Sequence, residues 1–193
     1  RLQGDWSSDV CSSDLVHRQH HKHSDHELDP HNSRRGLWWS HMGWIFHLLP
    51  HRMEAGFRQR MCPELERDLF HWGLDRTYLL WNGLFGVLLY ALGGLPWLVW
   101  GGCLRIVACF HMVGAINSVC HGHGRGYRNF DTRDQSVNVA WVAWLSAGEG
   151  YHNNHHAFPW SARMGLRKGE IDPAWMVLRA WERLGWVSHL KQP

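Results

Sequence analysis

Two histidine clusters with the same spacing, HxxHH, are the residues of this sequence best suited to chemistry. One comprises His17, His20 and His21, and the other comprises His152, His155 and His156. Positions i, i+3 and i+4 share one face of an α-helix, so each cluster would direct three imidazoles toward one point. A structural zinc site closes with four ligands and a catalytic site usually takes three from the protein, so six imidazoles indicate two metal ions. Imidazole binds iron, copper, zinc and nickel, and the ligand type alone leaves the metal open.

An apolar run from Thr77 to Cys120 lies between the two clusters, and Arg105 is its only formally charged residue. A membrane span needs about twenty apolar residues, and a Gly-Gly-Leu-Pro segment at 93–96 divides the run. The run therefore predicts two spans, roughly 78–92 and 95–119, joined as a hairpin; the alternative is a buried hairpin of a soluble α-protein. We expect Arg105 to face protein, because a charge exposed to lipid is costly.

Basic residues flank this run on both sides, whereas its tip carries none. They are Arg52, Arg58, Arg60, Arg67 and Arg76 before it, and Arg125, Arg128 and Arg133 after it. The positive-inside rule then puts both ends in the cytoplasm, which places the two histidine clusters on the same side. The sequence predicts an all-α integral membrane protein with a transmembrane hairpin at about 77–120 and a cytoplasmic helical cap that carries the histidines.

Shorter helices are expected around the clusters. A helix over 16–22 would carry the first cluster and end before Asp29-Pro30, and a helix starting near Pro63 would precede the apolar run. An apolar-rich helix over 134–146 would lead into the second cluster. Residues 172–185 predict an amphipathic helix that Asp172 caps at its start and Gly185 at its end, suited to packing or membrane-surface contact.

Length and composition indicate one domain in a chain of 193 residues. Residues 1–15 contain a near-repeat, WSSDV followed by CSSDL, and we expect a non-native or disordered leader ahead of a domain over 16–193. The five cysteines form no CxxC pair, which argues against a disulfide framework and a cysteine zinc site and favours a reducing, cytoplasm-facing location. A net charge of +3 with no basic recognition module argues against nucleic acid as a partner.

Taken in order, several motifs resemble those of membrane fatty-acid desaturases of the acyl-CoA and acyl-lipid delta-nine type, and the resemblance covers nearly everything after Leu15. The motifs are HRQHH at 17–21, DPHNSRRG at 29–36, SHMGW at 40–44, NSVCH at 117–121 and GEGYHNNHHAFP at 148–159. The resemblance implies an enzyme with two iron ions that uses dioxygen and two electrons to introduce a cis double bond, at the delta-nine position, into a saturated acyl chain.

The resemblance also implies a ligand set. The six clustered histidines and His121 would bind the iron ions, and Asn117 would hold an iron-bound water. Members of the family carry an earlier HxxxxH box on a preceding membrane helix, and no such box stands ahead of His17. We therefore expect this chain alone to bind metal incompletely and to be inactive. The implied partners are a fatty acyl-CoA or acyl-lipid, dioxygen, the membrane and a separate electron donor, either a ferredoxin or a b-type cytochrome.

Other residues near the motifs are candidates for supporting roles. Imidazoles that bind metal need acceptors for their second nitrogen, and Asp25, Asp29 and Glu149 are near in sequence. Four aromatic residues could line an acyl tunnel, although ordinary interface aromatics are the alternative: Trp38, Trp39, Trp44 and Tyr151. Arg34 and Arg35, and the group Arg163, Arg167 and Lys168, could meet an anionic headgroup, CoA phosphates or an acidic donor. Eight further histidines lack the spacing and are interpreted as non-ligands: His23, His26, His47, His51, His71, His111, His123 and His189.

Three other functions remain open. A related membrane hydroxylase with two iron ions would leave a hydroxyl group in place of a double bond. A non-catalytic metal-binding or transport protein would use the histidines to hold a divalent ion, although the apolar run has none of the acidic residues expected along an ion path. The chain could also be an inactive fragment.

Overall fold

The computed structural model describes residues 10–47 and 67–193, and within these ranges the chain is helical, with isolated β-bridges in place of strands. The prediction of an all-helical fold is confirmed for this part of the chain. The elements in order are α1 (Val10–His23), η1 (Ser33–Arg35), α2 (Leu37–His41), η2 (Gly43–Phe46), α5 (Leu69–Trp97), η4 (Leu98–Leu104, a π-helix), α6 (Arg105–Val119), α7 (Ala140–Leu145), α8 (His152–Ala157) and α9 (Pro173–Arg183).

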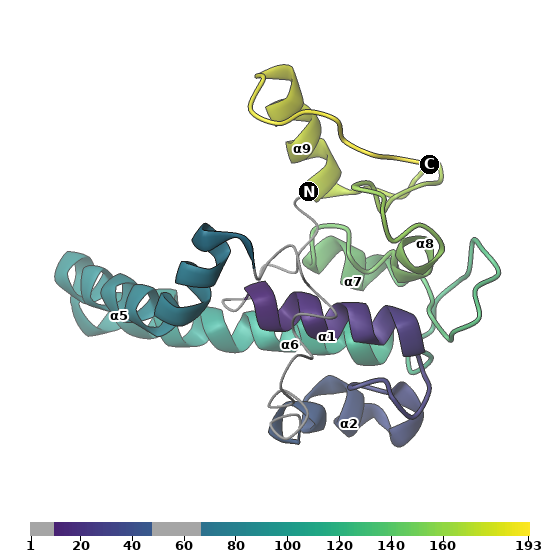
Figure 1. Ribbon diagram of the computed structural model, residues 1–193, viewed down its shortest axis with the longest axis horizontal. Helices are drawn as coiled ribbons and strands as arrows, with labels where there is room; N and C mark the ends of the chain where they lie inside the picture. The colour runs from purple at the N-terminus through teal and green to yellow at the C-terminus, as the bar shows by residue number, and fades with distance from the viewer. Residues whose placement is uncertain (1–9, 48–66) are drawn as a thin grey trace.

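The longest helical stretch runs through α5, η4 and α6 and changes direction within α5. Gly93 and Gly94 leave helical geometry there, and Gly94 has a φ of +64°, which favours glycine. Beyond the bend the chain packs back on itself, because a Cβ added at Gly101 would lie 3.2 Å from Leu89 Cδ2. In Figure 1, α5 extends away from the remaining helices, at the left of the view.

One candidate membrane span is found in the described part of the chain, Arg76–Val119, on length and apolar composition. Most of the large apolar side chains in this span are exposed, whereas Ile116 near its end is buried in the apolar core. Arg105, which we expected to face protein, is exposed; its Nε donates to Gly101 O and its guanidinium lies 5.5 Å from the Phe85 ring centroid. The transmembrane hairpin itself stays a prediction.

A small apolar core forms where the end of α6 meets α7. Ile116, Cys120, Val139 and Val142 are buried against one another, and Val119 and Val137 pack on them. Gly114 of α6 allows α2 to approach closely, because a Cβ there would lie 2.5 Å from His41 O. In Figure 1, α1 lies in front of α6, and His20 of α1 contacts His121, two residues after the end of α6. The last turn of α6 is therefore fixed by helices on several sides.

The prediction of a helix over 134–146 is wrong for its first half. Asp134 Oδ1 accepts hydrogen bonds from the Ser136 backbone and hydroxyl groups, and such local bonds compete with a helix. Val137 N donates to Cys120 O, and Asn138 bridges to Tyr127 and Tyr151. The segment is extended as a result, and α7 begins only at Ala140.

Two helix ends can be compared with their predictions. Asp172 caps α9 by accepting a hydrogen bond from Trp175 N, and Gly185 follows the helix with a φ of +75°, as predicted. Helix α1 begins at Val10 and thus includes the end of the segment 1–15; the rest of that segment, 1–9, lies outside the described residues. Arg52, Arg58, Arg60 and the helix start at Pro63 also lie outside them.

Candidate metal centre

Seven histidines from three parts of the chain converge at one place. His17, His20 and His21 lie on α1, and His152, His155 and His156 lie on α8. His121 lies two residues after the end of α6. They form two groups, in each of which the candidate ligand atoms lie within 4.8 Å of one another. The structure thus brings together all seven histidines that the sequence and the resemblance singled out.

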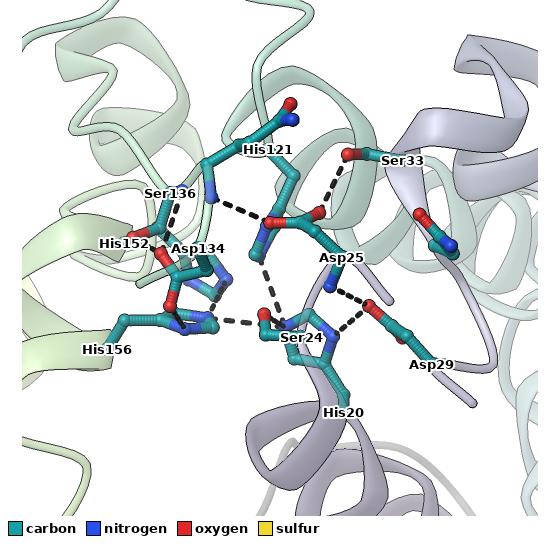
Figure 2. A network of polar contacts seen from close by, with 12 residues as sticks. His20, Ser24, Asp25, Asp29, Ser33, His121, Asp134, Ser136, His152 and His156 are labelled. Carbon is teal, nitrogen blue, oxygen red and sulfur yellow. Dashed lines mark hydrogen bonds and ion pairs between the residues drawn. The ribbon is translucent and has the colours of Figure 1, made fainter. Parts of the chain in front are cut away.

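The four-histidine group comprises His20, His121, His152 and His156. His20 Nε2 lies 3.2 Å from both His121 Nε2 and His156 Nε2, and His156 Nε2 lies 3.1 Å from His152 Nε2. Figure 2 shows these rings directed toward one another from α1, from the residues after α6 and from α8. The Nε2 atom of His20 therefore meets those of His121 and His156, which lie more than a hundred residues away in the sequence.

The three-histidine group comprises His17, His21 and His155. Its Nε2 atoms are separated by 3.1 Å between His21 and His17, 2.8 Å between His21 and His155, and 3.2 Å between His155 and His17. Helices α1 and α8 each supply residues to both groups. On each helix, the histidines at i and i+4 belong to one group and the histidine at i+3 belongs to the other, so the prediction that each cluster directs three imidazoles toward one point is wrong.

The arrangement of nitrogen atoms fits a bound cation. His20, His121 and His156 each direct Nδ1 at a carboxylate, so the proton sits on Nδ1 and Nε2 presents a lone pair. Lone pairs that face one another at these distances repel unless a positive charge lies between them. An imidazole nitrogen lies about 2.0–2.1 Å from a bound zinc ion. Two nitrogens that subtend a right angle at the metal would then lie about 3.0 Å from each other.

Carboxylates orient three of the four histidines in the four-histidine group. His20 Nδ1 donates to Asp29 Oδ2 at 2.9 Å, His121 Nδ1 to Asp25 Oδ2 at 3.2 Å, and His156 Nδ1 to Asp134 Oδ2 at 2.7 Å (Figure 2). Asp25 and Asp29 are two of the three carboxylates expected from the sequence. Asp134 was missed, because its segment was expected to be helical and no sequence signal linked it to His156.

Asp25 connects the histidines to the surrounding loops. It is buried with a φ of +61°, a conformation uncommon for a residue other than glycine. Besides His121, it accepts hydrogen bonds from Ser33 Oγ at 2.7 Å and Gln135 N at 2.7 Å. Burial alone would raise its pKa, but these hydrogen bonds outweigh burial and lower the pKa of Asp25 to about 2.

Burial dominates the protonation of the other groups. It lowers the pKa of His20, His152, His155 and His156 well below the ordinary histidine value, and that of His21 to about 3. Neutral imidazole is the form that binds metal. Burial also raises the pKa of Asp29 to about 7, against the backbone hydrogen bonds from Asp25 and His31. For Asp134, the hydrogen bonds from His156 and Ser136 outweigh burial and lower its pKa.

The two asparagines inside the second cluster fix α8. Asn153 and Asn154 are buried, at 0% and 1% exposed. Asn153 Oδ1 accepts from the backbone N–H groups of Asn129 and Phe130. Asn154 N donates to Asn138 Oδ1, while its side chain exchanges further bonds with Asn129, Asn138, Met164 and Glu170. Sequence reasoning assigned these residues no role.

The other residues predicted for supporting roles differ in how far they are buried. Asn117 is buried on α6, four residues before His121, and Glu149 is half-buried three residues before α8. Trp38, Arg34 and Arg35 are exposed. These placements leave the roles predicted for Asn117, Glu149 and the two arginines as predictions.

The predicted tunnel residues do not share one environment. The Arg35 guanidinium lies 3.3 Å above the Trp39 ring, Trp44 lies against His31, and Tyr151 is buried just before α8. His31 was not singled out by sequence, yet it is buried with its ring 4.2 Å from that of His20, and it forms a further candidate group with His20 and Asp29. His123 bonds to Ser33 O, away from both groups.

Comparison with known proteins gives a consistent set of relatives. The sequence profile for fatty acid desaturases matches residues 9–185. The sn-1 stearoyl-lipid 9-desaturase of Synechocystis sp. is 39% identical over 178 residues, covering 92% of this chain and 54% of that protein. The enzyme of the same name from Anabaena variabilis is 41% identical over 176 residues, covering 91% of this chain and 63% of that protein.

Another relative is named for a different substrate. The acyl-CoA 5-desaturase of Anemone leveillei is 40% identical over 195 residues, covering 100% of this chain and 58% of that protein. The chain thus spans between 54% and 63% of the length of these three relatives.

Proposed function

Since the chain belongs to the fatty acid desaturase family, we propose that its two histidine groups hold two iron ions in an oxygen-dependent acyl desaturase. The observation that carries the proposal is the convergence of the Nε2 atoms of α1, His121 and α8 into two groups. Three and four neutral imidazoles suit iron, among other metals, by their ligand type. The family relationship favours iron over the alternatives.

The residues of this chain have distinct tasks in such a reaction. The seven histidines would hold the metal ions, and Asp25, Asp29 and Asp134 would keep the proton on Nδ1 so that each Nε2 remains a ligand. Iron, when bound, supplies the oxidising power for an unactivated C–H bond, which no side chain can provide. In the balanced reaction, two hydrogens leave adjacent acyl carbons, and dioxygen with two electrons and two protons yields two waters.

The substrate and the position of the double bond follow from the family only in part. The relatives are named for stearoyl-lipid and for acyl-CoA substrates, and for positions 9 and 5. We propose insertion of a cis double bond at the delta-nine position, since two of these three relatives are 9-desaturases. The electrons would come from a separate ferredoxin or b-type cytochrome.

The exposed apolar stretch would place the metal centre at a membrane. We propose that residues 77–120 form a transmembrane hairpin with both ends in the cytoplasm and that the histidine groups face the cytoplasm beneath it. The support is the apolar stretch at Arg76–Val119, most of whose large side chains are exposed, and the arginines that flank it. Acyl chains could then reach the metal centre from the bilayer.

The test is fatty-acid profiling of a desaturase-deficient host that expresses the full reading frame. The wild-type protein is expected to produce monounsaturated acyl chains, and His156→Ala is expected to abolish them. His189→Ala, at an exposed histidine outside the groups, is the matched control and should retain the product. A hydroxylated product would support the hydroxylase instead, and iron binding without any product would support the metal-binding alternative.

A further inference from the structure

We propose that Glu170 is a positioning residue for both metal ions, because it fixes the helix that carries ligands to each of them. The inference rests on the proposed function for the identity of the ions. Glu170 lies outside every histidine motif, 14 residues beyond His156 in the sequence. Its role follows from the hydrogen bonds that it accepts.

Five donors converge on the Glu170 carboxylate. Oε1 accepts from Tyr127 Oη at 2.8 Å and Asn129 Nδ2 at 2.6 Å. Oε2 accepts from Asn154 Nδ2, Leu166 N and Arg167 N, each at 2.8 Å. The carboxylate therefore connects the 127–132 loop, the 164–167 segment and α8.

Only an ionised carboxylate suits this set of donors. Both of its oxygens accept, with about four lone-pair directions between them. Glutamine would replace one of these oxygens with an NH₂ group. That group would face either Asn129 Nδ2 or the backbone N–H groups of Leu166 and Arg167, and none of these nitrogens can accept a hydrogen bond. These hydrogen bonds also lower the pKa of Glu170, although burial opposes them. A neutral replacement would leave donors unpaired in a half-buried site.

The bond to Asn154 transmits this restraint to the ligands. Asn154 lies between His152 and His155 on α8, and its side chain is buried. His152 and His156 serve the four-histidine group, whereas His155 serves the three-histidine group. Rotation of α8 about its axis would move ligands of both groups together, so a residue that sets this rotation acts on both ions.

Asp134 provides a contrast, because it also contacts α8 but from the extended segment before α7. It contacts His156 alone among the histidines of α8, through a bond of 2.7 Å. Loss of Asp134 should disturb the ion in the four-histidine group more than the other ion. Loss of the Glu170 carboxylate should disturb both ions.

The experiment is ⁵⁷Fe Mössbauer spectroscopy of the full-length protein, purified with iron, together with iron content and a chelator titration. Glu170→Gln is expected to alter the signals of both ions and to lower iron affinity about tenfold at both sites, as for groups that support ligands elsewhere. Asp134→Asn is expected to alter one signal predominantly. Glu182→Gln, on the exposed face of α9 where Glu182 pairs with Arg179, is the matched control and should leave both signals unchanged.

A milder variant keeps the proposal testable if Glu170→Gln does not fold. Tyr127→Phe removes one donor from Oε1 and leaves the other four, so a smaller change in both signals is expected. If Glu170→Gln folds, the proposal is overturned when both signals are unchanged or when one signal alone changes. If Glu170→Gln does not fold, the proposal is overturned when the Tyr127→Phe spectrum matches that of the wild-type protein. A wild-type protein that binds no iron would instead refute the proposed function.

Discussion

At the scale of single residues, the carboxylates behind the histidines determine which nitrogen is available to a metal. His156 donates Nδ1–H to Asp134 at 2.7 Å, the shortest of the three such bonds. Without that acceptor, the imidazole can place its proton on Nε2 and lose its function as a ligand. The charge and the position of Asp134 therefore both matter.

Asp134→Asn is expected to lower metal affinity by about 10–100-fold, the usual cost of losing such a partner. Competition between the protein and a chelator of known affinity, followed by iron analysis, measures the change. Asp131→Asn changes an exposed carboxylate in the same loop and should have no effect. Equal affinity of the Asp134→Asn and wild-type proteins would show that the hydrogen bond does not support the ligand.

The sequence revealed the ligands more readily than their partners. The HxxHH spacing identifies six of the histidines directly, since a helix converts that spacing into one face. Asp25 and Asp29 could be suggested because they follow the first cluster within nine residues. Asp134 and Glu170 could not, because their contacts with α8 span 22 and 16 residues and depend on loops with no periodic pattern.

At the scale of elements, close approach between α7 and the start of α8 sets where the second cluster lies. Gly150 makes this approach possible, since a Cβ there would lie 2.1 Å from Ala143 N and 2.6 Å from Val142 C. Its carbonyl accepts from Val139 N at 2.8 Å. The obstruction is backbone, which cannot move aside as a flexible side chain would.

Gly150→Ala is accordingly expected to destabilise the protein by about 1–3 kcal/mol, the usual cost of overpacking, and to reduce iron content. Thermal unfolding of the purified protein, with and without iron, separates the two effects. Gly73→Ala lies on α5 with nothing within 4 Å of the added Cβ and serves as the control. Wild-type stability of Gly150→Ala in both states would contradict the packing described here.

Helix positions followed from sequence where capping residues or periodicity were strong. Asp172 marks the start of α9, and histidine spacing marks α1 and α8. The extended segment before α7 was missed because Asp134 and Ser136 bond locally and Asn138 pairs with Tyr127 and Tyr151, contacts that composition does not reveal.

At the scale of the whole molecule, polar and apolar side chains have an unusual distribution. In the described part of the chain, the buried residues are mostly polar. Most large hydrophobic residues of α5, η4 and α6 are exposed, such as Leu79 on α5 at 70% and Trp100 on η4 at 70%. An exposed apolar surface of this extent favours contact with lipid or with membrane segments of the full-length protein.

This arrangement predicts how the cysteines react in sealed membrane vesicles. Cys103 and Cys109 are exposed on η4 and α6, in the middle of the apolar stretch, whereas Cys120 is buried. A charged maleimide cannot enter the bilayer core, and a thiol there has no water in which to ionise. We expect Cys103 and Cys109 to be protected in vesicles and labelled after denaturation, with the sites located by mass spectrometry.

A cysteine placed at the exposed position Ser188 serves as the control for labelling, and it also reports on which side of the membrane the histidine groups lie. Since α9 and the residues after it belong to the part of the chain that carries the histidines, Ser188→Cys should react in inside-out vesicles and not in right-side-out vesicles. Reaction from the outer side would reverse the proposed orientation. Labelling of Cys103 and Cys109 by the charged reagent in intact vesicles would mean that the apolar stretch lies in water-accessible surroundings, and the proposal that the metal centre receives acyl chains from the bilayer would then be wrong.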